Sequence, residues 1–275
     1  MRHTPSAALH PLIASRSRRR SRRALAVLQL AVTAALAGCA PVHVAEQAPA
    51  SGETVVLLHG LARSSGSMEH MARSLANAGY HVCNIDYPSR EHDIATLARD
   101  YVAPRIAACA PADARVHFVT HSLGGIVVRQ LAASGAMPRI GRVVMLGPPN
   151  RGSEVVDALG DWRLFRMLNG PAGRELGTAD TATPRRLGAA SFPVGVIAGT
   201  RSVNWILSLI IPGEDDGKVA VRNARLDGMR DFAVVSAAHP FLMNDAAAIA
   251  MTIRFLAFEC FTCDASRPVP PARSP

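Results

Sequence analysis

Ser122 stands in a setting that could turn its hydroxyl into a nucleophile. It closes an apolar, β-branched run and precedes two glycines, in the stretch Val116-His117-Phe118-Val119-Thr120-His121-Ser122-Leu123-Gly124-Gly125. A serine hydroxyl is a weak nucleophile unless a tight strand-to-helix turn exposes it beside a base. Thr120 stands where the G-x-S-x-G signature of such turns has its first glycine. We therefore take Ser122 as the candidate nucleophile of an incomplete motif.

An activated serine also needs a base, an acid that orients the base, and donors for the oxyanion. His239 is the candidate base, because no other histidine follows His121 in the chain. Three adjacent acids, Glu214, Asp215 and Asp216, are candidates to orient it. His59 and His121 flank the expected site and are expected to be structural or to line the substrate.

Six short apolar runs are expected to be the strands that position these residues. They are Thr54–Leu58, His81–Ile85, Val116–Thr120, Arg142–Leu146, Val194–Ala198 and Phe232–Ser236. Nearly continuous Val, Ile and Leu is typical of parallel strands covered on both faces. Helical patterns separate the runs, so the sequence predicts an α/β fold with a doubly wound, mostly parallel sheet and helices on both faces.

Two helices carry local signals that can be checked. Ser67 is expected to cap a helix that ends before Gly79. A second helical stripe begins near Ile94, and Pro104 is expected to kink it or end it. Ser122, the acids and His239 each follow a predicted strand, so they should meet at the carboxyl edge of the sheet.

The order Ser, then Asp, then His is that of the α/β-hydrolase superfamily. Residues 52–258 resemble that superfamily, and within it the small bacterial lipases and esterases. The matching motifs are His59-Gly60-Leu61, Thr120-His121-Ser122-Leu123-Gly124-Gly125, Gly147-Pro148-Pro149-Asn150-Arg151-Gly152-Ser153, Asp215-Asp216-Gly217-Lys218-Val219 and Ala238-His239-Pro240.

The resemblance implies a role for each candidate residue. Ser122 would be the nucleophile and His239 its general base and later acid. Asp216, which precedes the Gly-Lys-Val turn, would hold the tautomer of His239. The backbone amides of Leu61 and Leu123 would form the oxyanion hole. No His-Glu or Cys-His cluster has metal-ligand spacing, so we predict neither a metal nor a cofactor.

The N-terminal segment has the layout of an export signal. Seven arginines precede the uncharged stretch 24–38, which ends in a Leu-Ala-Gly-Cys sequence that resembles the bacterial lipobox. We therefore predict a signal peptide over 1–38 and lipidation of Cys39, with a plain signal peptide or an uncleaved anchor as the alternatives. Residues 39–51 are expected to be a flexible tether, 52–260 the catalytic domain, and 264–275 a disordered tail.

Removal of the signal peptide changes the charge of the protein. The formal net charge is +9, and the seven arginines account for most of it, which leaves +2 for the remainder. No basic patch with interleaved aromatic residues follows, so we exclude nucleic acid as a partner. The expected location is outside the cytoplasm, on a lipid anchor at the outer membrane facing the periplasm.

The other four cysteines allow three disulfide connectivities. Because exported proteins keep disulfides, we favour the pairs Cys83–Cys109 and Cys260–Cys263. The Cys-x-x-Cys spacing of the second pair could also indicate a redox motif, but no thioredoxin-like unit surrounds it, so we discount that interpretation.

The sequence predicts a serine hydrolase that cleaves carboxylic esters, most readily lipid or acyl esters, through an acyl-enzyme. Residues 151–190 and 203–211 are apolar connections that could form a partial lid and an acyl pocket. An acyltransferase using the same site is an alternative, and so is a non-catalytic lipoprotein that binds lipid or a partner.

Overall fold

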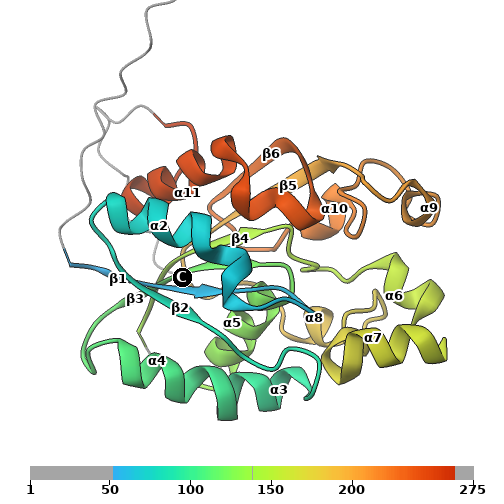
Figure 1. Cartoon of the computed structure of the whole chain (residues 1–275), viewed down its shortest axis with the longest axis horizontal. Coiled ribbons are helices and arrows are strands. Elements are labelled where there is room, and N and C mark those ends of the chain that lie inside the picture. The colour runs from blue at the N-terminus through green and yellow to red at the C-terminus, as the bar shows by residue number, and fades with distance from the viewer. Residues whose placement is uncertain (1–51, 138, 264–275) are drawn as a thin grey trace, which may run out of the picture. The chain divides into compact units, whose positions relative to one another are not determined.

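The computed structural model describes residues 52–137 and 139–263. The predicted signal peptide, Cys39, the tether and the C-terminal tail lie outside the described residues. The described part is a six-stranded sheet between two layers of helices (Figure 1). The strands are β1 (Thr54–Leu58), β2 (His81–Ile85), β3 (Val116–His121), β4 (Ile140–Leu146), β5 (Val194–Arg201) and β6 (Asp231–Ala238).

All neighbouring strands are parallel, in the order β2-β1-β3-β4-β5-β6. The chain moves outward from β1 to β2 and then crosses back to β3, so successive helices cover opposite faces. The predicted α/β fold with a doubly wound parallel sheet is confirmed. In such sheets, ligands bind at the carboxyl ends of the strands where the winding direction changes. Here that point lies between β1 and β3.

Alternation along β1 shows how both faces of the sheet are buried. Val55 and Leu57 pack into a core with α2 and α11, while Val56 and Leu58 pack into the core on the other face. All four are fully buried. Because neither face meets water, the strand is apolar at every position rather than at alternate ones.

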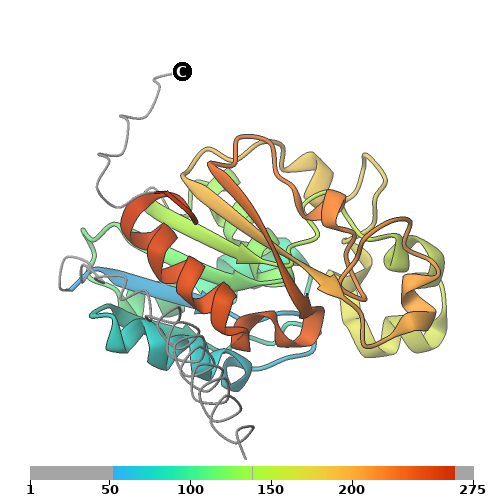
Figure 2. The ribbon, with the colours of Figure 1, turned by 90° about the horizontal axis from the view of Figure 1, so that it is seen from above.

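The helices fall into two layers and one group at the end of the sheet (Figures 1 and 2). One layer holds η1 (Ser65–Met68), α2 (Glu69–Asn77), η3 (His239–Asn244) and α11 (Ala246–Phe258). The other holds α3 (Ile94–Thr96), η2 (Leu97–Val102), α4 (Ala103–Cys109), α5 (Leu123–Ala133) and α10 (Val221–Ala224). The end group holds α6 (Glu154–Leu159), α7 (Arg163–Arg174), α8 (Thr183–Arg186) and α9 (Trp205–Ser208).

Two expectations about helices, the cap at Ser67 and the kink or end at Pro104, are wrong. Ser67 is not a cap: it lies inside the 3₁₀ turn η1, and its hydroxyl donates to the Ser64 carbonyl oxygen at 2.7 Å. At Pro104 the helical segment neither stops nor breaks. The wider π-helical turn η2 lies immediately before α4, in which Pro104 is a first-turn residue. Proline lacks the amide that a continuous helix would use at this position, and the wider π-helical turn just before it is a local irregularity of the kind that accompanies such a loss.

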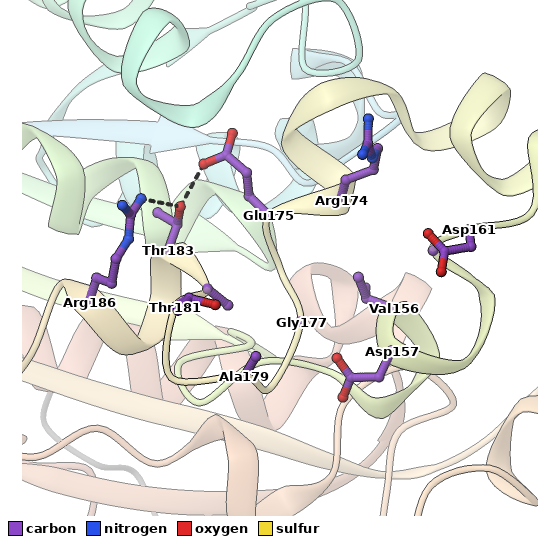
Figure 3. Close-up of a pocket in the computed structure, with 12 residues that line it drawn as sticks. Val156, Asp157, Asp161, Arg174, Glu175, Gly177, Ala179, Thr181, Thr183 and Arg186 are labelled. Atoms are coloured by element: carbon purple, nitrogen blue, oxygen red, sulfur yellow. Dashed lines mark hydrogen bonds between the residues drawn. The ribbon is translucent and has the colours of Figure 1, made fainter.

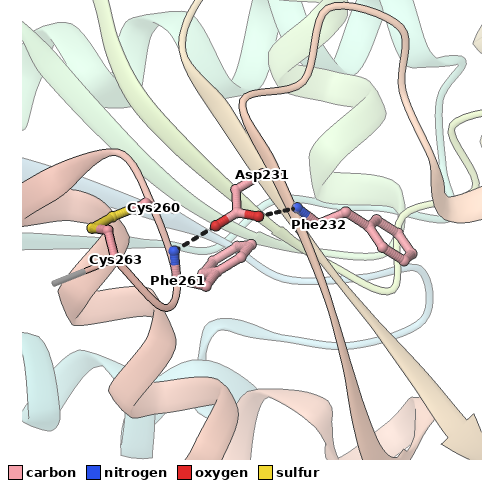
Figure 4. Close-up of a disulfide and its surroundings, with 5 residues drawn as sticks. All are labelled: Asp231, Phe232, Cys260, Phe261 and Cys263. Carbon is pink, nitrogen blue, oxygen red and sulfur yellow. Dashed lines mark hydrogen bonds between the residues drawn. A yellow bond between two sulfur atoms is a disulfide. The ribbon is translucent and has the colours of Figure 1, made fainter. Parts of the chain in front are cut away.

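Two disulfides link segments at the edges of the fold. Cys83–Cys109 joins β2 to the end of α4, and Cys260–Cys263 closes the turn after α11. These are the two pairs favoured from the sequence. Figure 4 shows how Asp231 secures the second turn: its carboxylate accepts from the Phe261 amide at 2.6 Å. None of the helices within the described ranges is long and apolar enough to cross a membrane.

Candidate active site

The turn between β3 and α5 places Ser122 in a backbone conformation that L-residues seldom adopt. Its φ is +53° and its ψ is −118°. Such strain persists only where the surrounding packing enforces it. Gly124 shows that packing, because a Cβ there would lie 2.6 Å from the Leu58 carbonyl oxygen on β1. The turn therefore needs glycine at 124 and exposes the serine side chain at the end of the sheet.

Thr120, which replaces the first glycine of the signature, is accommodated by the second of the two glycines. Its side chain is fully buried, and its hydroxyl lies 3.4 Å from the Val144 carbonyl oxygen. A Cβ at Gly125 would lie 3.3 Å from the same hydroxyl, tighter than most real contacts. The space occupied by Thr120 is thus left free by Gly125, and the turn keeps its geometry.

The structure brings Ser122, His239 and Asp216 together from the ends of three strands. His239 Nε2 lies 3.0 Å from Ser122 Oγ, and His239 Nδ1 lies 2.7 Å from Asp216 Oδ2. The three residues are 8%, 4% and 1% exposed, respectively. A carboxylate only accepts hydrogen bonds, so Nδ1 carries the proton and Nε2 is free to accept one from the serine.

Asp216 is held by more than its contact with the histidine. Its Oδ1 accepts from the Lys218 amide at 3.0 Å and the Val219 amide at 2.9 Å, while its backbone carbonyl accepts from the His239 amide. Asp215, the neighbouring candidate, instead accepts from the Ser208 hydroxyl and the Gly217 amide. Hydrogen bonding therefore selects Asp216 as the acid that faces the histidine.

The backbone amides of Leu61 and Leu123 are the two candidate oxyanion donors. Leu123 is the first residue of α5, and Leu61 lines the cleft beside Ser122. Within residues 52–263, apart from 138, neither amide donates to another residue. An amide at a helix N-terminus favours nearby negative charge. Both donors are available to an oxygen bound next to Ser122.

Comparison with known proteins assigns the fold a family. The model of a family described as the alpha/beta hydrolase family matches residues 55–272, about four fifths of the chain. The chain belongs to the alpha/beta hydrolase family. Its serine, acid and histidine lie in that family's order along the sequence.

Individual relatives of this hydrolase are distant. A Variovorax paradoxus (strain S110) protein named as the carbamate hydrolase RutD is 35% identical over 101 residues, which are 34% of this chain and 37% of that protein. The mature lipase BlEst2 of Bacillus licheniformis superposes with a TM-score of 0.61 at 23% identity, covering 77% of this chain and 95% of the lipase. Aspergillus fumigatus lipase B gives 0.56 at 16%, covering 81% and 55%. These two superpositions establish the fold alone.

The turn that carries the Leu61 amide is fixed by residues from the loop after β2. His59 Nδ1 lies 2.9 Å from the Gly60 carbonyl oxygen, so it carries the proton and donates. The Tyr87 hydroxyl donates to the His59 carbonyl at 2.6 Å, and the Ser89 hydroxyl accepts from the Ala62 amide. Sequence reasoning missed Tyr87 and Ser89, since nothing in the loop sequence marks them.

Burial keeps the two additional histidines of the hydrolase neutral. Desolvation lowers the pKa of His59 and brings that of His121 well below its ordinary value. The ring of His121 is buried, and its Nε2 donates to the His239 carbonyl oxygen at 2.9 Å. His121 therefore ties the serine turn to the loop that carries the candidate base. Both histidines thus hold backbone segments around Ser122, which corresponds to the structural one of the two roles expected for them.

An apolar cleft opens beside Ser122, with a cavity of about 50 Å³. Its apolar walls are formed by Leu61, Pro149, Val155, Val156, Phe165, Leu176 and Val219. Several of these residues belong to the predicted lid segment 151–190. None comes from 203–211, although Ile211 packs against Val155 of the same wall.

A larger hollow, of about 530 Å³, also has Val156 in its wall but none of Ser122, His239 and Asp216 (Figure 3). Its polar groups serve the fold: Glu175 accepts from the Thr183 hydroxyl at 2.6 Å and from the Ile94 amide. Within the described ranges, one group of residues has metal-ligand spacing: His81, Cys83 and Cys109. Its two thiols form a disulfide and are not available as thiolates.

Proposed function

We propose that the protein is a serine hydrolase that cleaves carboxylic esters, with lipid or acyl esters as its substrates. The observation that carries the proposal is the chain of contacts from Ser122 Oγ to His239 at 3.0 Å and on to Asp216 at 2.7 Å. It lies at the carboxyl edge of the sheet, where this fold binds ligands. Family membership supports the same reaction class.

In the proposed mechanism, His239 Nε2 takes the proton of Ser122 as Oγ attacks the ester carbonyl. The resulting oxyanion accepts from the Leu61 and Leu123 amides, each worth about 3 kcal/mol in related sites. His239 then gives its proton to the departing alkoxide, which leaves an acyl group on Ser122. Water, deprotonated by His239, releases the acid and restores the serine. Asp216 stabilises the imidazolium that forms in both halves.

An apolar rim near the cleft supports acyl or lipid substrates. The large, mostly exposed side chains of this rim are Trp162, Leu164, Met167, Leu168, Val203, Trp205, Ile206 and Leu209. They lie on or beside α7 and α9, which pack on a small shared core that includes Phe165 and Leu207. Pockets for small molecules measure roughly 300–1,000 Å³. The present cavity is much smaller, so we infer that segment 151–190 moves as a partial lid to admit an acyl chain.

The location remains a proposal from the sequence. We infer that the enzyme is exported and anchored through a lipidated Cys39 at the outer membrane, facing the periplasm. The disulfides Cys83–Cys109 and Cys260–Cys263 support an oxidising compartment. An anchor would hold the enzyme where acyl substrates are concentrated. Labelling with an alkynyl fatty acid, lost in Cys39→Ala, would test the anchor.

The activity is tested with p-nitrophenyl esters of increasing acyl length. Ser122→Ala should lower turnover by about 10⁴-fold or more, while Ser134→Ala, a matched change in an exposed serine at the end of α5, should leave it unaltered. Circular dichroism would verify the fold of both variants. Turnover retained by Ser122→Ala would contradict the proposal.

The short similarity to RutD makes carbamate hydrolysis a second candidate. A carbamate with the same p-nitrophenol leaving group would separate the two. Faster cleavage of the carbamate than of every ester would favour that candidate. Product analysis with an added alcohol would reveal acyl transfer as an ester of that alcohol.

A further inference from the structure

Two cationic side chains, Arg63 and Lys218, reach the candidate active site from different loops. Arg63 follows the turn that carries the Leu61 amide, and its guanidinium lies 3.5 Å from the carbonyl oxygen of Pro240, the residue after His239. Lys218 follows Asp216 by two residues and lines the cleft beside Ser122. The two side chains therefore flank the triad from the β1 loop and from the loop that carries the acid.

The electrostatics place both charges around the same point. The positive charges of Arg63 and Lys218 each help to lower the pKa of His121, the buried neighbour of Ser122. Desolvation lowers the pKa of Lys218, and the charge of Arg63 lowers it further. Both residues are exposed, so water screens their mutual repulsion, and together they create a positive potential beside Ser122 that favours a negatively charged ligand.

The charge of Asp216 acts on Lys218 and raises its pKa, but within the described residues no acidic side chain forms a close ion pair with either cation. Neither Arg63 nor Lys218 has a carboxylate oxygen within 4.0 Å, whereas Arg151 and Arg222 form ion pairs on the surface. Asp216 is the acid closest in sequence to Lys218, and its carboxylate is occupied by His239 and two backbone amides. Both cations are therefore available to a negatively charged group that binds beside Ser122.

The chemistry of the triad indicates which part of the substrate meets the cations. The acyl group would lie in the apolar cleft, and its carbonyl oxygen would accept from the free amides of Leu61 and Leu123. The leaving oxygen must receive its proton from His239 Nε2, so the alcohol part lies on the side of His239. Arg63 contacts the residue next to His239, and Lys218 belongs to the loop that carries the partner of His239.

We propose that Arg63 and Lys218 form a binding site for a negative charge on the alcohol part of the substrate. The preferred substrates are then esters whose alcohol carries a phosphate or carboxylate close to the ester oxygen. This inference rests on ester hydrolysis at Ser122. Lys218 forms its hydrogen bonds through the backbone: its amide donates to the Asp216 carboxylate, and its carbonyl oxygen accepts from the Ser153 hydroxyl. Its side chain can therefore be replaced without removing them.

The test compares two butyrate esters that differ in one charge: 3-carboxyphenyl butyrate and its uncharged methyl ester, 3-(methoxycarbonyl)phenyl butyrate. The readout is the ratio of kcat/KM for the charged ester to that for the uncharged ester. Partly exposed ion pairs contribute severalfold each, so the double variant R63Q/K218M should lower this ratio about tenfold. Arg73→Gln, a matched change in an exposed arginine on α2, should leave the ratio as it is.

Raising the ionic strength from 0.05 to 0.5 M should also lower the ratio for the unaltered enzyme, because salt screens partly exposed charges. A ratio that is the same in the unaltered enzyme and in R63Q/K218M would overturn the anion site. Failure of the unaltered enzyme to hydrolyse either ester would instead overturn the proposed function. The two failures are therefore distinguishable.

A second arm identifies the source of the charge. Phosphatidylglycerol and phosphatidylcholine with identical acyl chains would be compared in mixed detergent micelles. A preference for phosphatidylglycerol that disappears in R63Q/K218M assigns the site to anionic lipid headgroups. A charge preference confined to the soluble esters assigns it to small anionic esters. If the charge has no effect in either arm, the proposal fails.

Discussion

Replacing His59 with Phe tests how the Leu61 amide is aimed. The ring is fully buried and stacks on Tyr87 with a centroid distance of 4.2 Å and an interplanar angle of 14°. Phenylalanine keeps that stack and loses both nitrogens. The Gly60 carbonyl and the Leu61 amide belong to one planar trans peptide, so they point in opposite directions. Holding the carbonyl on His59 therefore directs the amide away from the ring.

The expected loss lies between two limits. The hydrogen bond from His59 Nδ1 to the Gly60 carbonyl is worth about 1 kcal/mol net, or about fivefold in rate if only that restraint is lost. Complete loss of the Leu61 donor would cost about 10²- to 10³-fold in kcat. His59→Phe should therefore lower kcat by about 5- to 10²-fold, with KM little changed, because the donor acts mainly in the transition state.

The assay pairs ester kinetics with a trifluoromethyl ketone, whose adduct with Ser122 places an oxyanion on the same donors. Its inhibition constant should rise by the same factor as kcat/KM falls. The Tyr87 amide donates to His59 Nε2 at 3.3 Å, so His59→Phe leaves both this amide and the Gly60 carbonyl without a partner and reduces stability. Active-site titration corrects for unfolded protein. His70→Phe, in an exposed histidine on α2, is the matched control. A folded His59→Phe enzyme with unaltered kcat and ketone affinity would refute the reasoning.

Three further predictions concern the acid, a disulfide and a buried histidine. Asp216→Asn should lower kcat by about 10⁴-fold, because an amide NH₂ facing His239 favours the wrong tautomer; circular dichroism should show an intact fold, and a loss under tenfold would contradict this role. Removing Cys83–Cys109 by double alanine substitution should lower the free energy of unfolding by about 3 kcal/mol in urea titrations; an unaltered midpoint would argue against the bond. The pKa of His121 is lower in the folded protein than in the unfolded chain, so the unfolded chain binds more protons at acidic pH. The free energy of unfolding should therefore fall as the pH drops below about 6.5, by up to about 1.4 kcal/mol per pH unit. Urea unfolding at pH 7.5 and 5.5 should show a shallower dependence for His121→Asn, and an equal dependence would contradict this.

The sheet could be predicted from the sequence because burial on both faces leaves a local mark. A parallel strand covered by helices, such as Thr54–Leu58, is apolar at every position, and all six strands were placed within a few residues of their observed bounds. The residues at which helices begin were harder to predict from the sequence. Ser67 is a good cap by residue type, but the 3₁₀ turn that precedes α2 depends on tertiary packing.

The site was predictable where chemistry restricts residue type. Ser122, His239 and the cluster of acids could be found because few residues perform those roles. The choice between Asp215 and Asp216 depends on which carboxylate faces the histidine, and hydrogen bonds with non-neighbouring residues decide that. Tyr87 left no signal, because its hydroxyl bonds to a backbone carbonyl 28 residues away.

The most direct test of the central claim is covalent labelling of the unaltered enzyme with a fluorophosphonate, followed by peptide mass spectrometry. Attack of an activated serine on phosphorus displaces fluoride and leaves a stable phosphonate ester on that serine. We expect one adduct, on Ser122, formed with loss of esterase activity, and none in Asp216→Asn or His239→Ala on the same time scale. Full activity without an adduct, or an adduct on a different serine, would contradict it.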